Sequence, residues 1–417
     1  MELGSDVYIY YPFLFITLYF ESFLLVTFLS KPARERRTKI AVKSTATSPK
    51  VAIIVPCWNE ETTIAGTVES LLALEYPKEK LSLILVNDGS TDGTSAVMDS
   101  YSEHPQISII HKENGGKFTA MNLGIEYAKD AEFIGFLDAD SFVAPDALRE
   151  IVSSFNEDKI AAVTASMSIH EPRTILQRMQ YAEYFLSIIT RHIFASINGL
   201  YVTPGPFSFY RRSIFADIGL FKHAYLAEDM EMALRIQRAG LCIDNAIRSR
   251  VYTKGPPDFS KLFKQRIRWV TGFLRNIIFD YRDLIGSRKN VVLGMFILPF
   301  SIVAIGSGIF LFIYSIIEMV NLGFHSLSMI QIVPLSYTLS WHQFSLSYFP
   351  ITVASLIGIM TTASIFVWMF IGKYLSETPG KLVSNVAIFL VFYSFIAPLW
   401  LIRSVSDVAL GTRTTWR

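Results

Sequence analysis

Two aspartates one residue apart, Asp138 and Asp140, follow a short apolar run at Phe133–Leu137. Side chains alternate along an extended backbone, so the two carboxylates leave the predicted strand side by side, with Ala139 turned away. Adjacent carboxylates repel each other, and Mg²⁺ is commonly held by one or two carboxylates together with the phosphates of a substrate. The pair therefore predicts a metal site, although it is also typical of an acidic turn before the helix that Pro145 begins.

Short apolar runs predict buried strands at 51–55, 81–86, 107–111 and 133–137. Helical segments alternate with them, which predicts an α/β fold: a mainly parallel sheet with helices on both faces. Ligands of such sheets bind beyond the carboxyl ends of the strands. Side chains at these ends are therefore the first candidates for a binding site.

The candidate substrate-binding residues at these strand ends are Pro56, Asn59, Glu60, Asp88, Lys117 and Asp138. Although they are scattered in the sequence, we expect them to converge on one edge of the sheet. Lys117 follows a Gly-Gly pair and lies opposite two carboxylates that favour a metal, which indicates a diphosphate site. Asp88, in a glycine-containing turn, is placed to accept a hydrogen bond from a base or a ribose hydroxyl. Each turn is ordinary by itself, and their combination favours a nucleotide site.

Glu228 and Asp229 begin a predicted helix that Gly240 ends. They are candidates for a catalytic base, and they are also good helix-capping residues. The helix N-terminus favours an ionised carboxylate, whereas burial of two carboxylates side by side raises the pKa of one of them. The sequence leaves open which effect is larger.

A further helix is predicted over Phe259–Arg275. Gln265, Arg268 and Trp269 stand at positions i, i+3 and i+4 and share one face, and Arg266 between them is a fourth candidate. An amide, a guanidinium and an indole can together bind a phosphate and stack on a sugar ring. The alternative is a basic helix at the membrane surface, with its Trp at the level of the headgroups.

The composition indicates a membrane protein. Hydrophobic residues make up 51% of the 417 residues, and the mean hydropathy is +0.36, which is too apolar for an ordinary soluble enzyme. Stretches long enough to span a bilayer lie at about 9–29, 292–320, 349–372 and 385–402. We therefore expect a first span at 1–30, a basic linker at 31–50, an α/β domain with the nucleotide site at 51–255, interfacial helices at 256–290 and about three more spans at 291–417.

The placement of charge predicts the orientation in the membrane. Between residues 31 and 50 the sequence has seven Lys and Arg residues and one Glu. The positive-inside rule therefore predicts a multi-pass cell-membrane protein in which the domain after this segment is cytoplasmic. Three later spans would place the C-terminus outside the cell. Arg403, Arg413 and Arg417 near the last span disagree with this under the positive-inside rule. A further membrane crossing within 325–348 would remove the disagreement. The start lacks the basic region of a signal peptide, and two cysteines exclude a disulfide framework.

Two further features have two interpretations each. Glu21 lies at membrane depth, where an ionisable residue is either functional or part of a helix–helix contact. Apolar residues recur at helical spacing from Leu176 to Ile193, which predicts an amphipathic helix packed on the core or lying on the membrane. We expect the membrane surface.

With these residues in place, the chain resembles the family 2 glycosyltransferases, above all the membrane-embedded synthases of cellulose, hyaluronan, chitin oligosaccharides and poly-N-acetylglucosamine. The shared pattern is an aspartate after the second strand, D-x-D after the fourth, an E-D pair and Q-x-x-R-W. Here it reads Asp88, Asp138-Ala139-Asp140, Glu228-Asp229 and Gln265-Arg266-Ile267-Arg268-Trp269. Asn87 and Ala227 differ from the Asp and Thr that many relatives carry.

The resemblance implies a GT-A-type domain and a role for each motif. Asp88 would contact the uridine, and Asp138 and Asp140 would serve Mg²⁺ or Mn²⁺ and the diphosphate. Asp229, beside Glu228, would be the catalytic base. The Q-x-x-R-W residues would hold the diphosphate and the acceptor sugar. One base without a second nucleophile implies direct displacement with inversion, and so a β-linked product from an α-linked donor.

The leading hypothesis is a membrane enzyme that extends a polysaccharide processively from a UDP-sugar, with UDP-N-acetylglucosamine as the expected donor. The alternative is a single transfer to a membrane lipid, because ceramide glucosyltransferases share much of the motif set. An inactive scaffold or pore is disfavoured by the intact motifs. The expected partners are the donor, a growing glycan or lipid acceptor and membrane lipids. A small membrane subunit or a second copy stays open, and no nucleic acid is expected.

Overall fold

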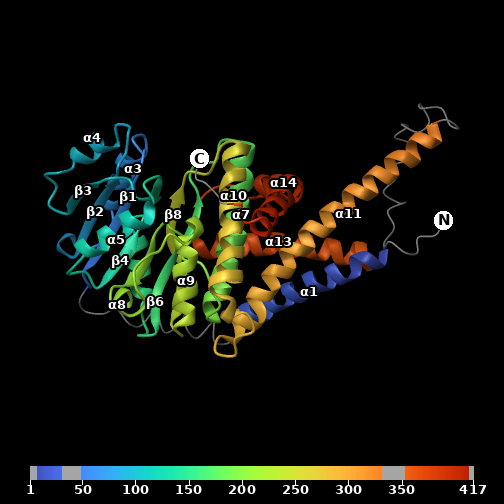
Figure 1. Cartoon of the computed structure of the whole chain (residues 1–417), viewed down its shortest axis with the longest axis horizontal. Coiled ribbons are helices and arrows are strands. Elements are labelled where there is room, and N and C mark those ends of the chain that lie inside the picture. Colours follow the sequence, from blue (N-terminus) through green and yellow to red (C-terminus); the bar gives the residue numbers. More distant parts are fainter. Residues whose placement is uncertain (1–6, 31–47, 331–352, 413–417) are drawn as a thin grey trace.

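A computed structural model of the protein describes residues 7–30, 48–330 and 353–412. It consists of an α/β domain and apolar helices, of which α1 (Val7–Leu29), α11 (Leu298–Ile330) and α13 (Val353–Ser376) lead away from that domain (Figure 1). Most of the predicted basic linker at 31–50 and most of the predicted external segment at 325–348 lie outside the described residues.

One eight-stranded sheet forms the centre of the α/β domain, in the order β3-β2-β1-β4-β7-β6-β8-β5. The strands are β1 (Val51–Cys57), β2 (Leu81–Asp88), β3 (Ile107–Lys112), β4 (Phe133–Phe136), β5 (Ser141–Val143), β6 (Ile160–Ile169), β7 (Ser208–Arg211) and β8 (Cys242–Thr253). The four predicted strands pair in parallel, whereas β7 is antiparallel to β4 and β6, and β5 is antiparallel to β8. The sheet is therefore mixed.

The direction of β7 decides which strand ends come together. Because β7 is antiparallel to both of its neighbours, β6 again runs parallel to β4, and β8 pairs in parallel with β6. The carboxyl ends of β1, β2, β3, β4, β6 and β8 therefore share one edge of the sheet, which we call the carboxyl edge.

Helices cover both faces of the sheet. Ile53 and Val55 of β1 belong to one hydrophobic cluster, and Ala52 and Ile54 belong to another on the opposite face. Burial on both faces explains why these strands read as continuous apolar runs. The helices within the domain are α3 (Ile64–Leu72), α4 (Thr94–Asp99), α5 (Lys117–Tyr127), α6 (Ala147–Ser154), α8 (Ile214–Ile218) and α9 (Glu228–Arg238).

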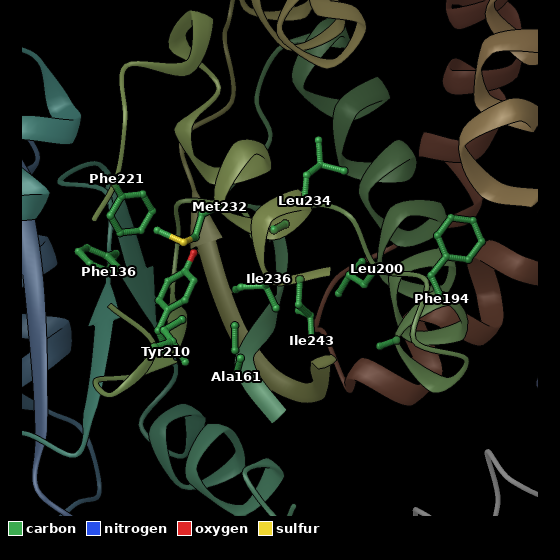
Figure 2. Close-up of a cluster of buried hydrophobic side chains, with 14 of the residues drawn as sticks. Phe136, Ala161, Phe194, Leu200, Tyr210, Phe221, Met232, Leu234, Ile236 and Ile243 are labelled. Atoms are coloured by element: carbon green, nitrogen blue, oxygen red, sulfur yellow. The ribbon is translucent and has the colours of Figure 1, made fainter. Parts of the chain in front are cut away.

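Figure 2 shows how α9 is fixed to the sheet. Met232 and Ile236 of α9 are fully buried in one cluster with Tyr210 of β7 and Phe136 of β4. The ring of Phe136 lies 5.7 Å from that of Tyr210 and 5.1 Å from that of Phe221. This aromatic packing holds α9 in place, and with it the acidic pair at its N-terminus.

Two longer helices, α7 (Ile175–Ser196) and α10 (Phe259–Arg275), connect the domain to the apolar helices. The bounds of α10 are those predicted. Of the two environments expected for α7, the structure shows packing on the rest of the protein, and a place at the membrane surface stays a prediction. Met179 and Phe185 of α7 are fully buried in a cluster with Met369 of α13 and Val386 of α14 (Val383–Ala409). Because α7 packs on the sheet with one side and on α13 and α14 with the other, its residue spacing alone could not distinguish these environments.

In the described part of the chain, α1, α13, α14 and a segment that includes α11 are long and apolar enough to cross a membrane, in agreement with the predicted spans. α14 differs from the others because both of its ends bond to α7 or α10. Arg178 of α7 donates to Asn385 Oδ1 at 2.9 Å, and Arg275 of α10 donates to the Asp407 carbonyl at 3.3 Å. Figure 1 accordingly shows α14 beside α7 and α10.

Glu21 joins α1 to α13. Its Oε2 accepts hydrogen bonds from the Ser364 hydroxyl and from the Trp368 indole N–H, both at 2.6 Å. Of the two interpretations of this residue, the structure supports a helix–helix contact.

Glu21→Ala is therefore expected to loosen α1 from α13, because the Ser364 and Trp368 donors lose their acceptor. Hydrogen bonds between membrane helices are worth about 1–2 kcal/mol, so the unfolding temperature in detergent should fall. Glu21→Gln keeps an acceptor oxygen and should stay near the wild type. An unchanged unfolding temperature in Glu21→Ala would contradict the contact interpretation.

Candidate active site

The Asp138–Asp140 pair follows β4 at the carboxyl edge. Both side chains are partly exposed, while Ala139 between them is buried, as the alternation predicts. Asp138 Oδ1 accepts a hydrogen bond from Lys117 Nζ at 2.5 Å, and Asp140 Oδ1 accepts one from the Ser141 hydroxyl at 3.0 Å. The pair thus lies at the middle of the edge, facing a lysine from α5.

Carboxylates repel each other strongly at this point. Burial, and then the charges of Asp138 and Glu60, raise the pKa of Asp140 to about 6. The pKa of Glu60 is raised too, first by burial and then by Asp138, against the hydrogen bond from Thr63. A positive charge close to these carboxylates would favour their ionised forms and lower their pKa values.

Lys117 is the cation at the centre of this edge. It begins α5 directly after Gly116, whose φ of +91° is rare for a residue with a side chain. Burial alone would lower the pKa of its ammonium group, but the charges of Asp138, Glu228 and Asp229 outweigh burial and raise it. Lys117 therefore links two acidic pairs that are far apart in the sequence.

The loop before β7 packs against the Lys117–Asp138 ion pair. A Cβ atom at Gly205 would lie 2.9 Å from Lys117 Nζ and 3.0 Å from Asp138 Oδ2. A side chain at this position would displace the ion pair. The sequence shows Gly205 between Pro204 and Pro206, but this pattern does not indicate that Lys117 and Asp138 are its neighbours.

Asp88 lies buried at the end of β2. Its Oδ1 accepts from the Gly115 N–H at 3.0 Å and from Lys112 Nζ, and its Oδ2 accepts from the Gly116 N–H at 2.9 Å. Asp88 therefore shapes the glycine turn that presents Lys117. Its contact with a base or ribose stays a prediction, to which the structure adds this role in the turn.

The residues after β1 connect to the turn after β2. Asn59 has a φ of +57°, and its Oδ1 accepts from the Thr91 N–H at 2.8 Å. The Glu60 N–H donates to Thr94 Oγ1 at 2.8 Å, and the partly buried Pro56 lies in β1 just before them. These three predicted residues are thus together, on the side of the edge nearest β2.

Glu228 and Asp229 form the first turn of α9. The Met230 N–H donates to Asp229 Oδ1 at 2.8 Å, and the Thr203 hydroxyl donates to the Asp229 carbonyl at 2.7 Å. Burial and then the charge of Glu228 raise the pKa of Asp229 to about 6, while Lys117 and Arg268 act in the opposite direction. Burial beside the second carboxylate is therefore the larger effect, which the sequence could not decide.

α10 brings Arg268 close enough for its charge to act on Asp229. Gln265 and Trp269, on the same predicted face, are partly buried. Gln265 Oε1 is buried and has no hydrogen-bond partner in the described part of the protein. Such an oxygen is unfavourable unless water or a ligand donates to it, so this helix face offers an acceptor to a ligand hydroxyl.

Arg266 is not placed as predicted. Its Nη2 lies 2.7 Å from Glu183 Oε2 of α7, and its side chain is 8% exposed. One residue along a helix turns the side chain by about 100°, which directs Arg266 to α7 and away from the face of Gln265. The guanidinium is engaged with a buried carboxylate, so a contact with the substrate would require this ion pair to open. The assignment of Arg266 to substrate binding stays a prediction.

The donor set at Asp138 and Asp140 fits a divalent cation that brings further ligands with it. The described residues contain no group of three or more side chains arranged to hold a metal ion. Mg²⁺ and Mn²⁺ accept carboxylate oxygens together with phosphate oxygens. The aspartate pair therefore fits a cation that is bound together with a diphosphate.

Comparison with known proteins supports this chemistry. A family model described as glycosyltransferase like family 2 matches residues 49–272. A poly-β-1,6-N-acetyl-D-glucosamine synthase from Staphylococcus epidermidis is 27% identical over 303 residues, which cover 71% of this chain and 71% of that protein. The synthase of the same name from Staphylococcus aureus (strain COL) is 29% identical over 256 residues, which cover 60% of each protein.

The fold is similar to that of a solved mannosyltransferase, PcManGT from Pyrobaculum calidifontis, in complex with GDP-Man and Mn²⁺. The TM-score is 0.52, over 96% of this chain and 99% of that one, at 17% identity. This likeness shows the fold alone, a GT-A sheet with flanking helices. The family model covers more than half of the sequence, including both acidic pairs and the Q-x-x-R-W motif, and the chain accordingly belongs to glycosyltransferase family 2.

Proposed function

We propose that this glycosyltransferase takes N-acetylglucosamine from UDP-N-acetylglucosamine and adds it repeatedly to a growing β-linked polymer at the membrane. The names of the staphylococcal relatives support the sugar and the polymer. The observation that carries the chemistry is the position of Lys117 between the Asp138–Asp140 pair and the Glu228–Asp229 pair. The groups for the donor and the groups for the acceptor thus meet around one ammonium group.

The donor diphosphate is proposed to bind beside Lys117 and the Asp138–Asp140 pair. Asp138 and Asp140 would hold Mg²⁺ or Mn²⁺, which supplies positive charge to the leaving UDP when bound. The Mn²⁺ in the solved mannosyltransferase supports a divalent cation. Lys117 and Arg268 add positive charge from the protein itself.

Asp229 is proposed as the catalytic base. Its Oδ1 is bonded to the Met230 N–H, which leaves Oδ2 to take the proton from the acceptor hydroxyl. A pKa near 6 makes this carboxylate more basic than usual and still ionised at neutral pH. The hydroxyl oxygen then forms a bond to the anomeric carbon while the bond to UDP breaks, and UDP leaves with the electron pair. Glu228 contributes through its charge, which raises the pKa of Asp229.

The acceptor sugar is proposed to stack on the indole of Trp269, with Gln265 Oε1 accepting from one of its hydroxyls. An aromatic face provides apolar contact for a sugar ring, and the buried oxygen of Gln265 needs a donor. The acceptor hydroxyl would then lie between this face of α10 and Asp229.

The catalytic domain is proposed to be cytoplasmic, with α14 lying along its membrane side. A helix of 27 residues is about 40 Å long, so a membrane-crossing α14 would have its two ends on opposite sides. Yet Asn385 bonds to α7 and Asp407 bonds to α10. With α14 in the interface, the C-terminus stays in the cytoplasm, and its arginines agree with the positive-inside rule. This replaces the expectation of an external C-terminus.

Purified membranes should release UDP fastest from UDP-N-acetylglucosamine among common UDP-sugars, and the product should be a long polymer. Asp140→Asn should abolish transfer while the protein stays folded, because it removes a metal-ligand charge at a strand end. Asp130→Asn makes the same change at an exposed site away from the edge and is the matched control. Normal turnover by Asp140→Asn would contradict the metal site, and a lipid carrying a single sugar would contradict the polymer.

Asp229→Asn should bind UDP normally and lose transfer by about 10²–10⁴-fold, the usual contribution of a positioned base. In the wild type, kcat/KM should fall as the pH drops through about 6, because protonated Asp229 cannot accept a proton. Loss of UDP binding in Asp229→Asn, or an acid limb near pH 4, would show that Asp229 is a helix cap.

The same variant has a predicted effect on stability. The pKa of Asp229 is raised from 3.8 to about 6 in the folded protein, so its ionisation destabilises the fold above pH 6 and has no effect below pH 4. The unfolding temperature of Asp229→Asn should therefore exceed that of the wild type at pH 7.5 and approach it at pH 4. A stability difference independent of pH would exclude this assignment.

Cysteine labelling tests the topology. In a cysteine-free background, Thr415→Cys should react only when a membrane-impermeant maleimide reaches the cytoplasmic side, as should Ser102→Cys in the catalytic domain. Labelling of Thr415→Cys from outside would show that α14 crosses the membrane.

A further inference from the structure

We propose that Glu183 and Arg266 form a pair that positions the indole of Trp269 for the acceptor sugar, and that Tyr393 of α14 completes it. The inference rests on the proposed function, in which Trp269 is the acceptor platform. It assigns a role to Glu183 and Tyr393, which no sequence motif marks, and a new role to Arg266.

Three helices meet at the carboxylate of Glu183. Arg266 Nη2 of α10 donates to Glu183 Oε2 at 2.7 Å, and the Tyr393 hydroxyl of α14 donates to Glu183 Oε1 at 3.4 Å. The side chains of Arg266 and Glu183 are 8% and 16% exposed. The carboxylate on α7 therefore fixes the orientation of the Arg266 guanidinium from one side.

The other side of Arg266 contacts Trp269. The guanidinium carbon lies 4.5 Å from the centroid of the indole ring, one helical turn along α10. This is within the distance of about 6 Å at which a cation and an aromatic face attract. Arg266 thus covers one face of the indole, and the sugar ring would stack on the opposite face.

Stability does not explain a charged pair at this place. Burial raises the pKa of Glu183 against the effect of Arg266, and a buried ion pair is often no more stabilising than apolar residues of the same size. Arg266 Nε, moreover, has no hydrogen-bond partner in the described part of the protein. The pair instead fixes an orientation. A planar guanidinium that is held by a carboxylate can stack on an aromatic ring in only one way, so the pair orients the ring as well.

The consequence is specific to the acceptor. Without the pair, Trp269 can turn about its side-chain torsions, and the acceptor hydroxyl moves relative to Asp229. The donor is bound by other residues, around Lys117 and Asp138, and should not be affected. Misplacement of a reacting group by about 1 Å can cost up to about 10²-fold in rate.

The test measures polymer transfer, hydrolysis of UDP-N-acetylglucosamine by water, the donor KM and the unfolding temperature in the full-length protein. Glu183→Gln and Arg266→Lys should lower transfer by about tenfold or more, with donor KM and donor hydrolysis near the wild type. Glu183→Gln should also lower the unfolding temperature, because it leaves the charge of Arg266 buried without its partner. Tyr393→Phe should have a smaller effect in the same direction. Glu171→Gln, which breaks the exposed Glu171–Arg173 pair, is the control and should change none of these quantities.

A double-mutant cycle with Trp269→Ala separates positioning from a general structural role. If Glu183 acts through the indole, Glu183→Gln should not lower the ratio of transfer to hydrolysis any further once the indole is absent. The same loss in both backgrounds would overturn the inference, as would an equal fall of transfer and of donor hydrolysis in Glu183→Gln. Failure of the proposed function looks different: the wild type would transfer no N-acetylglucosamine, or Trp269→Ala would transfer normally.

Discussion

The repulsion among carboxylates at the carboxyl edge is the constraint on which the rest of this structure depends. Burial, and then the charges of Asp138 and Glu60, raise the pKa of Asp140, and burial, and then the charge of Glu228, raises that of Asp229. Lys117 is the ammonium group that both acidic pairs share. Ionised carboxylates brought this close destabilise the folded state at neutral pH. The same carboxylates favour a metal ion that binds together with a diphosphate, so a site that disfavours folding favours the substrate.

The scaffold can be understood as the means of holding these charges together. The antiparallel β7 lets β6 and β8 join the edge that β1 to β4 begin. Asp88 fixes the turn before Lys117, and Gly205 lets a second loop approach the ion pair. The cluster around Tyr210 anchors α9. α7, α10 and α14 then connect the acceptor side of the site to the membrane helices, so the chemistry and the membrane attachment depend on the same packing.

The parts that the sequence predicts are those with a strong local signal. β1 to β4 are continuous apolar runs with polar residues at their ends, and the bounds of α10 follow from its spacing. β6 and β8 were not predicted, because nothing in their own residues shows which strands they pair with. Arg266 was assigned to substrate binding because it lies within the Q-x-x-R-W motif. A motif gives the spacing of residues along a helix, but which residues lie against each face of that helix depends on tertiary packing. Gly205 and Glu183 act through partners distant in the sequence, and no local pattern marks such contacts.

Mn²⁺ binding measured by electron paramagnetic resonance, with and without UDP, tests the central claim most directly. In the free enzyme, the Lys117 ammonium group forms an ion pair with Asp138, so Mn²⁺ should bind weakly. UDP should raise the affinity for Mn²⁺ by about tenfold or more, which is a usual size of coupling between two ligands. Lys117→Met should bind Mn²⁺ more tightly than the wild type in the absence of UDP, because Asp138 is then released from its ion pair. A Mn²⁺ affinity that responds neither to UDP nor to Lys117→Met would contradict the account.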